Sequence, residues 1–109
     1  MNKKAKAKIK VLVLDVMKPH KPNIAEFGQI LGDTKSIHNV NISVYAIDEK
    51  TESVKIVLDG TEIDLEKLEE TIEKFGAVIH SMDKVVVGDK KIIEAPGLPT
   101  GIDQKKMMK

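Results

Sequence analysis

The alternation of hydrophobic and polar positions predicts four β-strands and two α-helices in this chain. The run V-L-V-L-D-V, residues 11–16, has one polar member and is too short for a buried helix. Three of its six residues are β-branched, which favours a strand. Alternate residues place Val11, Val13 and Asp15 on one face and Leu12, Leu14 and Val16 on the other. Because both faces are largely apolar, we expect a central strand that is covered on both sides.

Two segments have the spacing of amphipathic helices. The first follows a proline-containing turn, begins after Asn23 as N-cap and ends at Gly32. Gly28 lies on its apolar face, and we expect it to allow a close approach of this helix to the sheet. The second begins after Asp64 and ends at Gly76. The apolar stripes of the two helices are Ile24, Phe27, Ile30 and Leu31, and Leu65, Leu68, Ile72 and Phe75.

The remaining apolar segments predict a hairpin and a last strand. Residues 40–47 and 54–58 alternate between apolar and polar, and the polar segment 48–51 separates them, which is typical of a β-hairpin. The last strand is expected over residues 77–87. Its consecutive apolar pairs leave open which face is inward, and residues 91–94 are a candidate for a short fifth strand.

The order β-α-β-β-α-β predicts an α+β fold of the ferredoxin-like kind, a four-stranded antiparallel sheet with two helices on one face. In this arrangement the first and third strands are central. The other face of the sheet would expose Val11, Val13 and Val57, with Tyr45 on an edge strand. Apolar surface left in water costs about 25 cal/mol per Å². We therefore expect these four residues to form an interface with a second copy of the chain.

Length and composition favour one domain with a charged tail at each end. We expect residues 1–8 to be a mobile lysine-rich tail, residues 9–94 the ferredoxin-like domain and residues 95–109 an extended tail. The 109 residues include no cysteine, which excludes disulfides and thiolate metal sites. No stretch has the ~20 apolar residues that span a bilayer, so we expect a cytoplasmic protein without membrane contact.

The charge distribution argues against nucleic acid as a partner. The net charge is +1, but eight of the 18 lysines lie in the first ten and last five residues. Residues 11–104 then carry ten lysines against 17 carboxylates, a charge of −7. A body of this sign repels nucleic acid, and the sheet lacks the aromatic platforms of RNA-recognition modules. Weak contact of the lysine-rich tails with nucleic acid is the alternative, although such a tail more often serves solubility.

Asp15, His20 and His80 are the candidates for a ligand site. Asp15 interrupts an apolar strand before a turn, where it could bind a metal, act as a general base or pair with His20. Because the first and last strands are neighbours in the expected fold, His80 could lie near both. The alternative is that the carboxylate is satisfied at the strand end, and that the two histidines have ordinary backbone partners. No catalytic constellation is recognisable.

A divalent cation such as Ca²⁺ is the other candidate ligand, because carboxylate oxygens are its preferred partners. The loop 59–64 holds three carboxylates in six residues, but a turn that leads into an N-cap explains the same letters. Copies of a carboxylate could also gather around an ion between subunits. The candidate metal ligands are Asp15, Asp59, Glu62, Asp64 and Asp83.

Three motifs, in this order, resemble one protein family. They are L-D-V-M-K-P-H-K-P-N-I, N-V-N-I-S-V-Y-A-I-D and G-A-V-I-H-S-M-D-K-V-V-V-G. Over residues 9–94 the chain is similar to the archaeal domain of unknown function 211 family. The resemblance implies a ferredoxin-like fold and assembly as a homo-oligomer, for example a ring, and it implies no activity. From the sequence we expect a self-assembling domain without enzymatic activity, with a small ligand or cation between subunits. The alternative is a small enzyme or metal-dependent regulator centred on Asp15 and His20.

Overall fold

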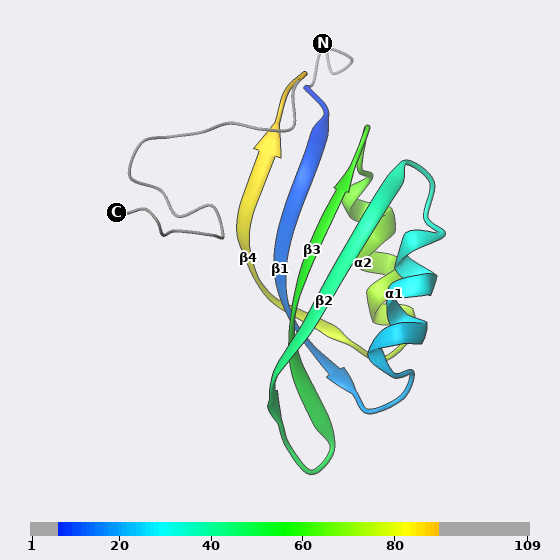
Figure 1. Cartoon of the computed structure of the whole chain (residues 1–109), viewed down its shortest axis with the longest axis vertical. Coiled ribbons are helices and arrows are strands. Elements are labelled where there is room, and N and C mark those ends of the chain that lie inside the picture. The colour runs from blue at the N-terminus through cyan, green and yellow to red at the C-terminus, as the bar shows by residue number, and fades with distance from the viewer. Residues whose placement is uncertain (1–6, 90–109) are drawn as a thin grey trace.

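The computed structural model describes residues 7–89, which form four strands and two helices. In chain order these are β1 (Ile9–Pro19), α1 (Ile24–Gly32), β2 (Ile37–Ile47), β3 (Thr51–Gly60), α2 (Leu65–Lys74) and β4 (Val78–Val87). The β-α-β-β-α-β order and its element types confirm the predicted ferredoxin-like α+β fold. Figure 1 shows the strands side by side in one curved sheet.

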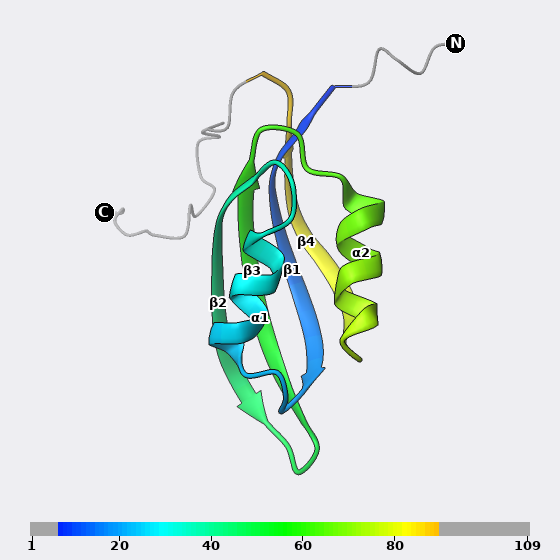
Figure 2. The ribbon, with the colours of Figure 1, turned by 90° about the vertical axis from the view of Figure 1, so that its right-hand side faces the viewer.

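The strands lie in the order β2-β3-β1-β4, and all neighbours are antiparallel. The prediction that the first and third strands are central is therefore confirmed, and Tyr45 lies on the edge strand β2. Both helices lie on the same side of the sheet (Figures 1 and 2), where α1 packs against β2 and α2 against β4. The side of the sheet away from the helices is called the open face below.

The core lies between the sheet and the helices. Its members from the strands alternate along the chain, as a sheet with one covered face requires. Leu12, Leu14 and Val16 of β1 are fully buried, and so are Phe27 and Leu31 of α1. The other fully buried core residues are Val54, Ile56, Leu58, Leu68 and Ile72.

Both helices begin at the predicted caps. The side chain of Asn23 accepts a hydrogen bond from the Glu26 amide at 2.8 Å, and the side chain of Asp64 accepts one from the Lys67 amide at 3.1 Å. The expectation for Gly28 is wrong. A Cβ atom at this position would lie 3.6 Å from the Cδ1 atom of Ile42, which is an ordinary contact, so the packing does not require glycine here.

Strand β4 is irregular, which explains why its inward face could not be predicted. Its pairing with β1 shifts register between Ile9 and Val11, between Val13 and Leu14, and between Asp15 and Val16. Each shift interrupts the two-residue period that assigns side chains to faces. In the structure Ile79 packs against the core, and Val78 next to it is exposed.

Two other predictions fall partly or wholly outside the described residues. The fifth strand at residues 91–94 lies outside them, as do most of the two tails. The Gly88 amide donates to the carbonyl of Lys8 at 2.8 Å, so backbone pairing between the first and last strands reaches residue 8. Neither helix in residues 7–89 has the length and apolar character needed to cross a membrane.

Candidate functional site

The open face of the sheet carries the candidate interface residues. Val13 of β1 lies between Val57 of β3 and Lys84 of β4, and it is partly exposed. Three other apolar residues of the open face are exposed: Val57 is 37% exposed, and Met17 and Val78, which pair further along β1 and β4, are 44% and 61% exposed. No helix in the described part of the chain covers these residues (Figure 2).

A polar network crosses the same face and joins all four strands. The hydroxyl of Tyr45 on β2 donates to both carboxylate oxygens of Asp15 on β1, at 2.6 and 2.8 Å. The Lys55 ammonium on β3 lies 3.9 Å from Asp15 and also pairs with Asp83 on β4. Ser81 of β4 donates to the second oxygen of Asp83 at 2.7 Å. We call these five residues the open-face network.

A register shift in β2 occurs at Tyr45, the residue that contacts Asp15. Val44 pairs with Val54, but Ala46 already pairs with Ser53, so Tyr45 is an extra residue in the strand. A bulge of this kind turns the side chain of the extra residue. The alternation of the two strands indicated that Asp15 and Tyr45 share a face, but it did not indicate that their side chains touch.

The contacts of the open-face network hold Tyr45, Lys55 and Asp83 in their ordinary ionisation states. The hydrogen bond to Asp15 raises the pKa of Tyr45, and the hydrogen bond to Asp83 raises the pKa of Lys55. The hydrogen bonds from Lys55 and Ser81 lower the pKa of Asp83. Each shift moves a pKa away from neutrality, whereas a general acid or base needs a pKa near the working pH. These three groups are therefore suited to binding and orientation rather than proton transfer.

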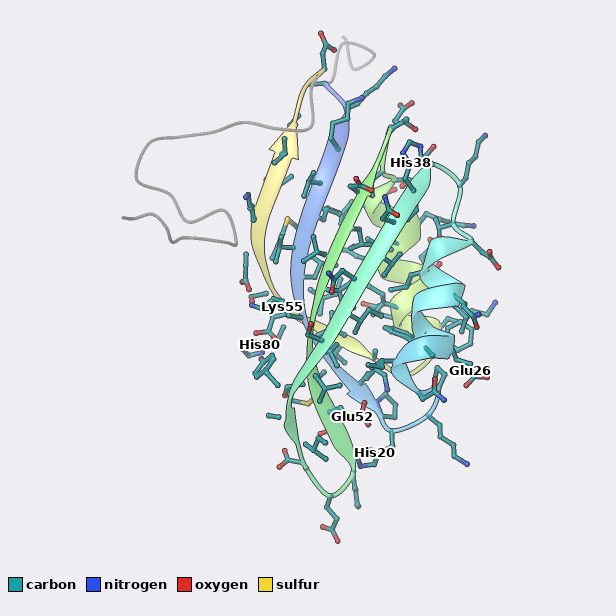
Figure 3. All side chains as sticks on the ribbon, viewed as in Figure 1. His20, Glu26, His38, Glu52, Lys55 and His80 are labelled. Carbon is teal, nitrogen blue, oxygen red and sulfur yellow. The ribbon has the colours of Figure 1, made fainter. Side chains whose placement is uncertain are left out.

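A second polar cluster lies where the β2–β3 hairpin meets the end of β1 (Figure 3). The ammonium of Lys18, a residue only 1% exposed, donates to Glu52 at 3.0 Å and to the carbonyl of Pro19 at 2.8 Å. The other carboxylate oxygen of Glu52 lies 3.1 Å from the Nδ1 atom of His20. These contacts lower the pKa of Glu52, with the His20 contact as the largest cause. Alternation after Val16 places Lys18 on the buried face, which is the signal that could have identified it.

The three candidates for a ligand site do not come together. Asp15 lies in the middle of an eleven-residue strand and contacts Tyr45, whereas His20 contacts Glu52. The proposed pairing of Asp15 with His20 is therefore not formed, because the strand continues past Asp15 to Pro19. His80 is exposed on β4, one residue before Ser81, and Figure 3 shows it near Lys55 and away from His20.

The candidate metal ligands have separate positions. Asp59 accepts a hydrogen bond from the Asn39 side chain at 3.1 Å, and Asp64 caps α2. Glu62 lines a surface hollow beside the start of α2, while Asp83 belongs to the open-face network. Within residues 7–89, no three His, Cys, Asp or Glu side chains are grouped so that they could hold a metal ion.

Comparison with known proteins gives two matches. The profile of the domain of unknown function 211 family, described as "Uncharacterized ArCR", matches residues 10–101. The chain is also 45% identical, over 91 residues, to "Uncharacterized protein MJ0319" of Methanocaldococcus jannaschii. That alignment covers 84% of this chain and 93% of the relative.

Proposed function

This chain belongs to the domain of unknown function 211 family, and we propose that it is a self-assembling domain whose open sheet face binds a second copy of itself. The observation that carries the proposal is the exposed apolar surface of that face. Val57, Met17 and Val78 lie there without a helix above them. Burial of such surface against another subunit removes it from water, at about 25 cal/mol per Å².

The size of the open face supports an interface between two copies. Four strands at ~4.8 Å spacing and about eight residues at ~3.3 Å each give roughly 500 Å² on each subunit. Two such faces bury about 1,000 Å² together, which is the lower limit for a specific interface. We therefore expect an assembly that depends on protein concentration.

The charges of the open face favour a partner of the same kind. Asp15 and Asp83 are negative, and Lys55 and Lys84 are positive, within one small area. A second copy across a two-fold axis presents the same set in reverse, so that opposite charges can face one another. Polar residues in the middle of an interface also select one orientation among several.

The experiment compares Val13→Asp with the unchanged protein at micromolar concentration. Val13 lies opposite Lys84, so the introduced carboxylate has a cationic neighbour within the subunit and the variant should fold. In the interface, however, it would be a buried charge beside Asp15. We expect light scattering to show an oligomer for the unchanged protein and a monomer for the variant.

Ala25→Asp is the matched control, because Ala25 is exposed on α1, away from the open face. This variant adds the same charge and should keep the oligomeric mass of the unchanged protein. A monomeric unchanged protein would contradict the proposal. An equal loss of assembly in both variants would also contradict it, since the effect would then follow net charge rather than the open face.

A small ligand or a divalent cation between subunits, such as Ca²⁺, remains a prediction. So does the alternative of an enzyme or metal-dependent regulator, but the separate partners of Asp15 and His20 give it less support. A thermal-shift screen with divalent metals and metabolites tests both. A response that Asp15→Asn abolishes, with an unchanged melting temperature in the absence of ligand, would favour the alternative.

A further inference from the structure

His20 makes contacts that only its protonated form can satisfy together. Its Nδ1 atom lies 3.1 Å from a carboxylate oxygen of Glu52. Its Nε2 atom lies 3.1 Å from the carbonyl oxygen of Asp48 and 3.0 Å from that of Glu49. All three partners are acceptors. A neutral imidazole carries one N–H group, so it can donate from one ring nitrogen only. The imidazolium donates from both ring nitrogens.

The contacts join two segments that are distant in the sequence. His20 follows β1 in the connection to α1, and Asp48 and Glu49 form the turn between β2 and β3. Within the turn, the Asp48 amide donates to the carbonyl of Thr51 at 2.8 Å. The ring of His20 is therefore a link between this turn and the end of β1, and Figure 3 shows it beside Glu52 at that end of the sheet.

The carboxylate of Glu52 favours the protonation of His20. Glu52 of β3 is the carboxylate in direct contact, and it also pairs with Lys18 of β1 through its other oxygen. The turn contributes backbone carbonyls, and Asp48, Glu49 and Lys50 are exposed. Lys21, the next residue in the chain, is exposed as well. Glu52 is therefore the charge that acts most directly on the imidazole.

We infer that His20 is a proton-operated clasp, which holds the β2–β3 turn against the end of β1 when it is protonated and releases the turn when it loses its proton. On deprotonation one ring nitrogen becomes an acceptor. The charged carboxylate of Glu52 is a stronger acceptor than a carbonyl, so the remaining N–H group stays with Glu52. The contact of the other ring nitrogen with the two carbonyls of the turn is then lost. The site thus binds a proton, and the loss of that proton lets the β2–β3 turn move away from the end of β1.

The direction of the pH dependence follows from these contacts. The hydrogen bond from the His20 ring to the Glu52 carboxylate is the largest cause that raises the pKa of His20. A group whose pKa is higher in the folded state stabilises that state fully below its unfolded pKa, about 6.5 for histidine. This stabilisation is lost as the pH rises through the folded-state pKa. The clasp is therefore closed in mild acid and open in mild base.

The test follows the titration of the full chain by NMR between about pH 5 and pH 9. The ¹⁵N shifts of the His20 ring report its protonation, and the ¹³C carbonyl shifts of Asp48 and Glu49 report the contact. We expect the ring to titrate above the usual histidine value and both carbonyl shifts to move with the same midpoint. Independence of the ring and carbonyl titrations would overturn the inference.

Two variants separate the clasp from general effects of pH. His20→Gln should abolish the titration of the two carbonyl shifts, while His80→Gln should leave it unchanged. Persistence of the carbonyl titration in His20→Gln would contradict the assignment. If His20→Gln does not fold, the ring shifts of the unchanged protein still decide the question, because a normal histidine midpoint would exclude the clasp.

Discussion

Glu52→Gln should destabilise the protein more than Lys18→Met, although the two residues form one ion pair. The Lys18 ammonium is only 1% exposed, and its two acceptors are Glu52 and the Pro19 carbonyl. Removal of the Glu52 charge leaves a buried cation without a counter-ion. Removal of Lys18 leaves a carboxylate that is 17% exposed and still bound to His20. Water and the imidazole can compensate for that loss.

The magnitudes follow from this difference. A fully buried charge that loses its partner costs about 3–5 kcal/mol. Glutamine keeps a neutral acceptor at the same place, so we expect about 2–3 kcal/mol for Glu52→Gln, the value of a charged hydrogen bond. Methionine preserves most of the Lys18 stem beside Phe27, whose ring centre lies 6.0 Å from the ammonium. For Lys18→Met we expect a loss of about 1 kcal/mol or less.

The assay is urea unfolding at pH 7 of both single variants and of the double variant. In the double variant no buried charge remains, so its free energy of unfolding should be close to that of Lys18→Met alone, with a coupling of about 2 kcal/mol. His20→Gln measured in parallel accounts for the contact that Glu52→Gln also removes. Equal losses in the two single variants, or losses that add in the double variant, would refute the reasoning.

Two glycines should respond to alanine in opposite directions. Gly28→Ala should raise the free energy of unfolding by about 1 kcal/mol, because alanine favours the helix. Its Cβ atom would lie in ordinary contact, 3.6 Å from Ile42. A lower midpoint of thermal unfolding would contradict this expectation. Gly60→Ala should cost about 3 kcal/mol, because a Cβ atom there would lie 2.0 Å from the carbonyl oxygen of Ser36. A free energy of unfolding in urea that is the same for Gly60→Ala and the unchanged protein would contradict this expectation, because the backbone at Ser36 would then have moved at no cost.

The local periods of the sequence were sufficient to predict the elements and most of the core. A repeat of 3.6 residues identifies a helix and a repeat of two identifies a strand, and neither requires knowledge of distant residues. For this reason the caps Asn23 and Asp64 and the central position of β1 are as predicted, and two members of each predicted helical stripe are buried. The open face was also predictable, because two helices on one side of a sheet leave the other side without a cover.

The contacts between polar side chains were decided by the tertiary structure alone. Tyr45 contacts Asp15 across the intervening strand β3, at a position where β2 has an extra residue, and the period of two says nothing about where such a residue occurs. His20 meets Glu52 across 32 positions of the sequence, and Lys18 meets it across 34. Such pairs depend on strand register and on the course of turns. Register results from the packing of all four strands together, so no single segment of the sequence contains it.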